Sequence, residues 1–347
     1  MTLCAAFKRL GDIEGEREAI ESALVVDPYF LPALLAKAFW LERFDGRASA
    51  ATMYNNALAV APPPTKWPPL LQKDLEHARD FSTRYAVDFD AFLAHELDHI
   101  ISSVPSPLRS RWRESAAILS GRSKPYHAVV NQLCVPRLPA IPFFEREQFP
   151  FLATLEAKTE VIRQELEAAL ASAKNEFVPY IQYAPGEPVN QWVELNHSLR
   201  WSTLQLMRSG KVVQANLDMC PETAKVLAHL PLADIGGLCP NVMFSALAPK
   251  SRIPPHNGET NARVVAHLPL IVPEGCRYRV GFEWREWRVG ETLIFDDTIE
   301  HEAINDSDEL RVVLIFDLWN PFLTIPEREL VRTLAAAARS FTAGASA

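Results

Sequence analysis

The sequence predicts an α+β protein of two domains, an N-terminal array of paired helices followed by a barrel of antiparallel strands. Two observations predict this arrangement. The motif ALVVDP at Ala23 recurs as ALAVAP at Ala57, a shift of 34 residues, which is the period of a two-helix repeat unit. The second half of the chain instead contains strand-like runs, and two of them meet histidines, His256 and His301, at their ends.

The first domain is expected to span residues 1–120 and to be a tetratricopeptide-like (TPR-like) repeat domain. Apolar spacing predicts helices over residues 14–26, 31–43 and 47–60, and Pro32 is compatible with the first turn of the second helix. Two further helical segments, LLQKDLEHARDFSTRYAVDF and AFLAHELDHIISS, extend the array. A repeat array of this kind serves either as a structural support or as a groove for an extended polypeptide, and the sequence does not distinguish between the two.

A proline-rich segment, residues 121–142, is predicted to be a linker, and residues 143–347 are predicted to form the second domain, a double-stranded β-helix (jelly roll). It should begin with one long amphipathic helix from about Phe151, which covers a face of the barrel. A strand follows over residues 201–207, then a short helix in CPETAKVLAHLP, strands up to residue 319, and a closing helix in ERELVRTLAAAARSF.

Two strands show their faces directly, because side chains alternate along a strand. In RVVAHL, Arg263, Val265 and His267 share one face, and the intervening residues are apolar. The run RVVLIFDL is apolar on both faces, which predicts a central strand. Arg311 stands at its start, where burial of a charge is unfavourable unless an anion meets it.

His256, His301 and Arg311 together predict a ligand site. Histidines brought together from separate strands form a nitrogen-donor site suited to Fe(II). An arginine on the next strand can hold a small dicarboxylate by bidentate pairing. The mouth of the barrel is the expected place for such a ligand.

Several segments resemble the aspartyl/asparaginyl β-hydroxylase family of Fe(II)- and 2-oxoglutarate-dependent oxygenases. They are HNGETNARVVAHL, GETLIFDDTIEHE and the strand 311–319, with RWSTLQL, CPETAKVL and Ser245 upstream. The set covers roughly residues 140–325 and is specific as a group, although each piece alone is short. By this resemblance His256 and His301 match the two iron ligands, while Ser245 and Arg311 match the pair that holds the distal carboxylate of 2-oxoglutarate.

The resemblance also implies roles for three pocket residues. His267 and Trp201 match positions beside the cosubstrate, and Arg263 is the expected contact for an acidic or amide group of the substrate. Related iron oxygenases carry a carboxylate two residues after the first histidine. In this sequence Gly258 stands at that place, as the resemblance to the family implies. A water is expected to take the ligand position that the carboxylate would otherwise fill. Val265 replaces a second arginine found in many relatives, which puts a preference for aspartate-like substrates in doubt.

The family implies Fe(II), 2-oxoglutarate and O₂ as metal, cosubstrate and oxidant. The expected reaction is hydroxylation of the β-carbon of an Asp/Asn-type residue in a protein or peptide, with release of succinate and CO₂. The alternatives are a family member acting on a free amino acid, a lipid or another small molecule, a cupin-like metal protein with different chemistry, and an inert barrel whose repeats bind a partner.

The segment HELDH, residues 95–99, matches the H-E-x-x-H zinc motif, in which Glu96 would act as a general base. It lies within an amphipathic helix, and no third histidine follows at the usual spacing. We therefore interpret it as part of the helical scaffold.

Composition and charge exclude several classes of function. A net charge of −8 leaves no basic stripe for nucleic acid. No apolar run approaches the roughly 18 residues of a membrane span, and the segment MTLCAAFKRLGDIEGE has no long apolar core of the kind expected in a signal peptide. Five scattered cysteines indicate a reducing, cytoplasmic setting, and a disulfide between Cys220 and Cys239 is not expected. We expect a polypeptide or small-molecule substrate, and the TPR-like domain serves either to bind a protein partner or to support the barrel.

Overall fold

The computed structural model describes residues 2–172 and 177–344. The chain divides into two compact units, Met1–Pro125 and Tyr126–Ala347. The segment expected to be a linker falls across this division. Its later part hydrogen-bonds within the second unit, where Val129 N donates to Thr298 O at 2.8 Å and Gln132 N to Glu259 O at 2.9 Å.

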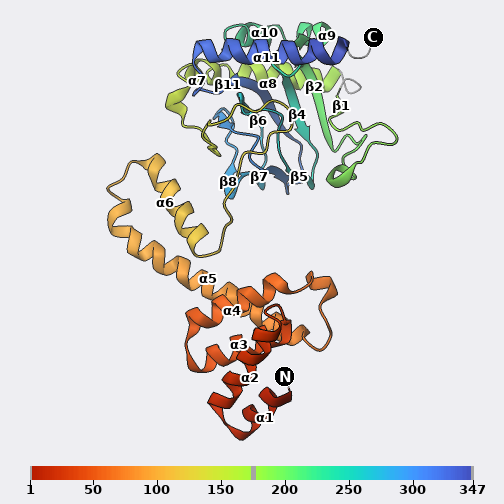
Figure 1. Cartoon of the computed structure of the whole chain (residues 1–347). Coiled ribbons are helices and arrows are strands. Elements are labelled where there is room, and N and C mark those ends of the chain that lie inside the picture. Colours follow the sequence, from red (N-terminus) through yellow and green to blue (C-terminus); the bar gives the residue numbers. More distant parts are fainter. Residues whose placement is uncertain (1, 173–176, 345–347) are drawn as a thin grey trace. The chain divides into compact units, whose positions relative to one another are not determined.

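The first unit is helical (Figure 1). Its helices are α1 (Thr2–Leu10), α2 (Ile13–Val26), α3 (Leu31–Phe44), α4 (Arg47–Val60), α5 (Gln72–Ile101) and α6 (Ser106–Leu119), with a 3₁₀ turn η1 (Pro64–Lys66). The predicted helices at residues 14–26, 31–43 and 47–60 are confirmed by α2, α3 and α4. Pro32 lies in the first turn of α3 as expected.

Helices α3, α4 and α5 enclose the core of this unit. Alanines at positions 38, 50, 57 and 78 are fully buried, and their small side chains allow the helices to approach closely. Tyr54 fills the centre and packs edge-on against Phe39, with ring centroids 5.5 Å apart. This packing supplies the burial that a short amphipathic helix needs to be stable.

Two expected helices are in fact one, because α5 runs for 30 residues from Gln72 to Ile101. The junction between the two predicted segments contains neither glycine nor proline, so the hydrogen-bonded backbone continues through it. Asp90 at the junction accepts a hydrogen bond from Arg122 at 2.6 Å. Helices α1 and α6 were not predicted.

The second unit contains two antiparallel sheets. In the described residues the larger sheet has seven strands in the order β1-β2-β4-β11-β6-β9, with β3 paired to β2, and the smaller has the order β5-β10-β7-β8. The strands are β1 (Val178–Pro179), β2 (Trp201–Arg208), β3 (Lys211–Val212), β4 (Val242–Leu247), β5 (Ser251–His256), β6 (Arg263–Ile271), β7 (Cys276–Val280), β8 (Glu283–Glu286), β9 (Leu293–Phe295), β10 (His301–Asn305) and β11 (Arg311–Trp319).

The predicted faces of β6 and β11 are confirmed. Strand β11 is central, flanked by β4 and β6. Val264, Ala266 and Leu268 of β6 belong to the core beneath the helices, whereas Val265 packs in a separate cluster on the other face, together with Val313. One face of the large sheet is therefore sealed by helices, and the other faces the smaller sheet.

Helices cover the sealed face, as Figure 1 shows for α8 and α10. The bounds of the helical elements are η2 (Arg146–Gln148), α7 (Leu152–Glu156), α8 (Thr159–Ser172), η3 (Asn190–Trp192), α9 (Gln214–Asp218), α10 (Pro221–Leu227) and α11 (Ile325–Gly344). The single long helix expected from Phe151 is divided into α7 and α8. At the break, the carboxylate of Glu156 accepts a hydrogen bond from Thr292 N, and Thr159 Oγ1 donates to Glu156 O.

Candidate active site

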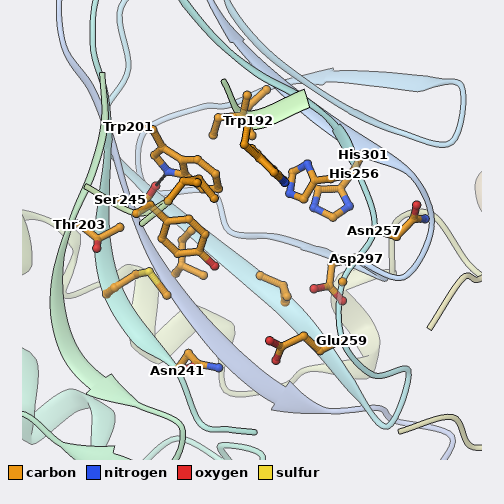
Figure 2. Close-up of a pocket in the computed structure, with 18 of the residues that line it drawn as sticks. Trp192, Trp201, Thr203, Asn241, Ser245, His256, Asn257, Glu259, Asp297 and His301 are labelled. Atoms are coloured by element: carbon orange, nitrogen blue, oxygen red, sulfur yellow. Dashed lines mark hydrogen bonds between the residues drawn. The ribbon is translucent and has the colours of Figure 1, made fainter. Parts of the chain in front are cut away.

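A cavity of about 1060 Å³ opens on the face of the large sheet that the helices leave free. Strands of both sheets contribute side chains to it, which is why residues distant in sequence meet there. Its lining includes every site residue expected from the sequence: Trp201, Ser245, His256, Arg263, His267, His301 and Arg311. Figure 2 shows the two imidazoles at one end of this cavity, opposite Trp201 and Ser245.

His256 ends β5 and His301 begins β10, and the two residues are direct partners in the antiparallel register. Their ring centroids are 4.0 Å apart. In each ring Nδ1 lies next to a backbone carbonyl two residues earlier, Pro254 O at 2.8 Å and Ile299 O at 3.0 Å. Because a carbonyl oxygen only accepts, both Nδ1 atoms carry the proton, and both Nε2 atoms keep a free lone pair.

Burial keeps these imidazoles uncharged. Loss of solvent, reinforced by the neighbouring His301, lowers the pKa of His256 to about 3. Burial likewise lowers the pKa of His301 to about 4. Two neutral imidazoles with parallel tautomers and free Nε2 atoms fit a borderline divalent metal such as Fe(II). Across the described residues, no group of three or more His, Cys, Asp or Glu side chains is arranged to hold a metal, so the fit rests on two protein ligands.

Arg311 is buried and has no counter-ion in the part of the chain that the structure describes. The side chain is 1% exposed. Its Nη1 donates to Ser245 O at 3.3 Å, its guanidinium carbon lies 4.7 Å from the centre of the Trp287 ring, and its Nε has no hydrogen-bond partner in the described structure. Burial lowers the pKa of Arg311 to about 10, so the group remains charged at neutral pH. A buried charge of this kind calls for an anionic ligand.

Ser245 and Trp201 lie on neighbouring strands beside Arg311. Trp201 Nε1 donates to Ser245 Oγ at 3.1 Å, and the Trp201 ring stacks on Tyr180 with centroids 4.0 Å apart. The indole holds the serine hydroxyl in place, and its own position is fixed by the stacking. The sequence linked these two residues only through resemblance, and the structure brings them into contact.

His267 lies on the cavity face of β6 and is packed among aromatic rings. Its ring centroid is 4.8 Å from that of Phe295 and 5.1 Å from that of Tyr278. Burial, together with the nearby Arg311 charge, holds the pKa of His267 well below its usual range. A neutral histidine in this position contributes shape and a hydrogen-bonding nitrogen to the cavity, and its Nδ1 has no partner among the described residues.

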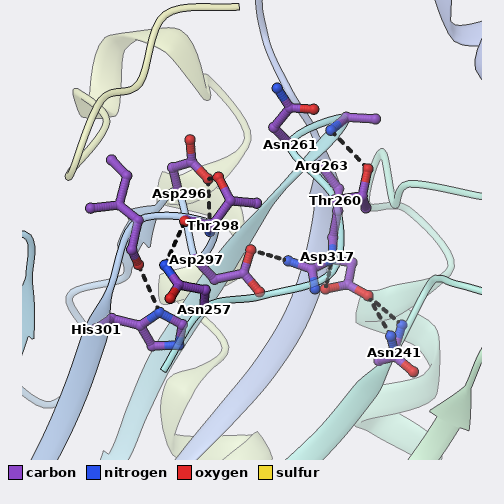
Figure 3. Close-up of polar contacts among 12 residues, drawn as sticks. Asn241, Asn257, Thr260, Asn261, Arg263, Asp296, Asp297, Thr298, His301 and Asp317 are labelled. Carbon is purple, nitrogen blue, oxygen red and sulfur yellow. Dashed lines mark hydrogen bonds and ion pairs between the residues drawn. The ribbon is translucent and has the colours of Figure 1, made fainter. Parts of the chain in front are cut away.

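Arg263 is placed differently from expectation. Its Nη1 lies 2.8 Å from Asp297 Oδ1 and its Nε 3.1 Å from Asp317 Oδ1, and Asn241 N donates to Asp317 Oδ2 at 2.7 Å (Figure 3). Two carboxylates from the same chain therefore neutralise this guanidinium. The expected role of Arg263 as the contact for an acidic substrate group needs a free charge, so we revise it to that of holding Asp297 at the cavity.

Asp297 is a cavity residue that the sequence analysis missed. It lies four residues before His301, between β9 and β10, and it lines the cavity close to the imidazoles (Figure 2). A β-carbon built on Gly258 would lie 2.0 Å from Asp297 Oδ2. The Asp297 carboxylate thus fills the space that any side chain at position 258 would need, which explains why glycine stands where related sites carry an acid.

The zinc-like segment of α5 shows no comparable site. The rings of His95 and His99 are exposed, with centroids 6.2 Å apart, and no third ligand joins them in the described part of the chain. All five cysteines are free, including Cys220 and Cys239. No described helix combines the length and apolar character that crossing a membrane requires.

Comparison with known proteins matches residues 156–321 to the family described as aspartyl/asparaginyl beta-hydroxylase. The chain is 33% identical over 176 residues to the human aspartyl/asparaginyl beta-hydroxylase, covering 50% of this chain and 22% of that protein. It is 31% identical over 209 residues to aspartate beta-hydroxylase domain-containing protein 2 of Xenopus tropicalis, covering 59% and 54%. It is 33% identical over 183 residues to the ornithine lipid ester-linked acyl 2-hydroxylase of Rhizobium tropici, covering 52% and 61%.

The chain thus spans between 22% and 61% of the length of these three relatives. The matched segment contains the whole cavity wall formed by β2, β4, β5, β6, β10 and β11. It includes both imidazoles, the buried arginine and the serine beside it. Residues 156–321 of this chain are thus similar to the aspartyl/asparaginyl beta-hydroxylase family.

Proposed function

We propose that this chain is an Fe(II)- and 2-oxoglutarate-dependent oxygenase that hydroxylates a C–H bond of a polypeptide or small-molecule substrate. The observation that carries the proposal is the buried Arg311 charge, which has no carboxylate partner among the described residues and lies in the same cavity as two neutral imidazoles with free Nε2 atoms. A dicarboxylate such as 2-oxoglutarate supplies the missing anion. We further propose that the two sheets form a jelly-roll barrel.

Each residue has a defined task in this proposal. His256 and His301 would hold the metal through Nε2, and the Pro254 and Ile299 carbonyls orient the rings. Arg311 and the Ser245 hydroxyl would bind the distal carboxylate of 2-oxoglutarate, and Trp201 orients that hydroxyl. When bound, iron supplies the oxidative chemistry in which 2-oxoglutarate and O₂ yield succinate, CO₂ and a hydroxylated substrate.

Asp297, which lines the cavity near the two imidazoles, would have a positioning role. Its carboxylate stands where the third ligand of related sites originates, yet it comes from another segment of the chain. Arg263 holds it in an ion pair, so it is fixed as an acceptor for a water or a donor group at the metal. We propose that Asp297 orients such a water and does not itself bind the metal.

The family supports an Asp/Asn-type residue in a peptide as the target, hydroxylated at its β-carbon. A second candidate is hydroxylation of a small molecule, which is favoured by the similarity to a relative named for acting on a lipid acyl group. We infer a cytoplasmic location and propose that the helical unit, a TPR-like array, binds a protein partner or the polypeptide substrate.

The decisive test is anaerobic titration with Fe(II) and 2-oxoglutarate, following the weak visible charge-transfer band. Wild-type protein should show the band with saturable 2-oxoglutarate dependence, and Arg311→Ala should weaken 2-oxoglutarate binding by about 30-fold or more, the value of a lost charged pair. The matched control is Arg277→Ala, because Arg277 also lies over a tryptophan, 5.0 Å from the Trp284 ring, but outside the cavity. Unchanged affinity in Arg311→Ala would reject the proposal.

A further inference from the structure

Glu259 is an acidic side chain of the cavity for which the proposed reaction has no use. It follows the turn after β5 and lines the cavity. Figure 2 shows its carboxylate projecting into the open space below Asp297, on the side away from Trp201 and Ser245. The side chain is half-buried and forms no hydrogen bond or ion pair with any residue that the structure describes.

The charges around Glu259 do not compensate it. Arg263 is the nearest cation of the buried lining, but it is already paired with Asp297 and Asp317. Position 265, on the same strand face as Arg263, carries valine. This end of the cavity therefore holds three carboxylates against one guanidinium.

The other charged residues of the cavity do not offset this excess of negative charge. Arg311 is reserved for the distal carboxylate of the cosubstrate under the proposed function. The remaining charged residues of the lining, Arg208 and Glu187, are exposed and opposite in sign. The substrate end of the cavity thus presents an excess of negative charge in a partly desolvated space.

The pKa of Glu259 is consistent with an excess of negative charge at this end of the cavity. Burial raises its pKa above the usual range, and the nearby Asp297 and Asp317 raise it further, while Arg263 opposes them. A cation that enters the cavity would stabilise the ionised form of a carboxyl in this environment.

We propose that the substrate group entering this cavity carries a positively charged nitrogen, an ammonium or guanidinium, which Glu259 binds, and that anionic aspartyl side chains are disfavoured. This inference rests on the proposed function for the position of the reacting carbon, and it replaces the Asp/Asn-type target named there by a basic residue or a basic small molecule. An acidic side chain would instead meet three carboxylates, and the buried guanidinium among them, that of Arg263, is already paired, so binding loses free energy through like-charge repulsion.

The test measures binding without turnover. Protein loaded with Mn(II) and N-oxalylglycine, an unreactive analogue of 2-oxoglutarate, is titrated by calorimetry with one host peptide whose central residue is Lys, Arg, norleucine, Asn or Asp. Norleucine keeps the length of lysine without its charge. Wild type should bind the Lys and Arg peptides at least about tenfold more tightly than the norleucine peptide, and the Asp peptide more weakly than the Asn peptide.

Two variants assign the effect to one carboxylate. Glu259→Gln, which keeps the shape, should reduce the preference for Lys over norleucine to about twofold or less. Glu187→Gln should keep the full preference, since Glu187 is exposed at the cavity and its carboxylate accepts a hydrogen bond from Ala184 N at 2.7 Å. N-oxalylglycine affinity, measured in parallel, reports whether each variant retains the folded cosubstrate pocket.

Two results would overturn the inference: an Asp peptide that binds wild type as tightly as the Lys peptide, or a Lys preference that Glu259→Gln leaves intact. Failure of the proposed function gives a different signature, namely no binding of N-oxalylglycine and no succinate from any peptide with Fe(II) and O₂. The peptide titrations can then be repeated on metal-free protein, because the Glu259 contact does not require the metal.

Discussion

Asp297 occupies the volume that a side chain at Gly258 would fill, with Oδ2 only 2.0 Å and Cγ 2.2 Å from the position of a β-carbon there. The carboxylate has little freedom to move aside. It is buried and paired with Arg263, and its backbone carbonyl accepts a hydrogen bond from Gly258 N at 2.7 Å. The position of the Asp297 carboxylate thus requires glycine at position 258, although the two residues lie in different segments of the chain.

Gly258→Ala should therefore displace Asp297 from Arg263 and lower the free energy of unfolding by about 1–3 kcal/mol, the usual cost of overpacking. Chemical denaturation measures this change. The control is a double-mutant cycle with Asp297→Ala, which removes the clashing atoms. The double variant should lose less stability than the sum of the two single variants, by about 1 kcal/mol or more. Simple additivity would contradict the steric relationship.

Arg311 and Arg263 should respond in opposite ways to loss of charge. Arg311→Met removes a buried charge that has no carboxylate partner, so the ligand-free protein should gain roughly 1 kcal/mol of stability, after allowance for the lost contact with Trp287. Arg263→Met leaves Asp297 and Asp317 without a cation and should cost about 3–5 kcal/mol.

Thermal unfolding of the two methionine variants, with and without 2-oxoglutarate and Mn(II), measures this contrast. Added 2-oxoglutarate should raise the melting temperature of the wild type. It should leave the melting temperature of Arg311→Met unchanged. If both variants destabilise the ligand-free protein equally, the Arg311 charge is compensated in a way that the contacts described above do not include.

Asp296 should make stability depend on pH. Burial raises the pKa of its carboxyl to about 6, and Asp297 adds to the rise against the hydrogen bonds from Thr298. The folded state therefore favours the protonated form. Its contribution to stability is complete below the unfolded pKa of about 4 and is lost as the pH rises through about 6.

Asp296→Asn keeps the oxygen that accepts from Thr298 but does not ionise. The free energy of unfolding of the variant, relative to wild type, should increase by about 1–3 kcal/mol between pH 4 and pH 7. Urea denaturation at several pH values measures the difference, and comparison with wild type cancels the other titrating groups. A difference that stays constant with pH would show that folding leaves the pKa of Asp296 unchanged, which contradicts the prediction.

In the helical unit, Tyr54 joins ring packing to a buried hydrogen bond. Its hydroxyl donates to Glu42 Oε2, which also lies 2.8 Å from His77 Nε2. Tyr54→Phe retains the ring and should cost about 1–2 kcal/mol from the lost hydrogen bond. Denaturation followed by helical circular dichroism measures the loss, and Tyr29→Phe, at a side chain that is 72% exposed, should have no measurable effect.

The sequence was sufficient to predict elements whose pattern is local. The 34-residue shift and the apolar spacing predicted α2, α3 and α4, and the alternation in β6 and β11 predicted which side chains face the core. Helix breaks were less predictable. The expected division of α5 is absent because no residue there interrupts the backbone, whereas the break between α7 and α8 depends on Glu156 meeting Thr292, 136 residues away.

The residues of the candidate site likewise differ in whether the sequence could predict their role. Histidines and an arginine at strand ends carry a chemical signal in the sequence itself, and the structure brings His256, His301 and Arg311 into one cavity. Arg263 gave an equally strong signal, yet its charge is neutralised by Asp297 and Asp317. Neither pairing can be read from spacing, because the partners lie 34 and 54 residues further along the chain.

Period and residue type act within a single element, so they were enough to predict the helical and β-rich halves, the two histidines and the buried arginine. Tertiary structure decided which charges remain free. Ion pairing falls off over a few ångströms, so the excess of acid at Glu259 and the filling of the Gly258 position by Asp297 exist only once the strands and turns are in place.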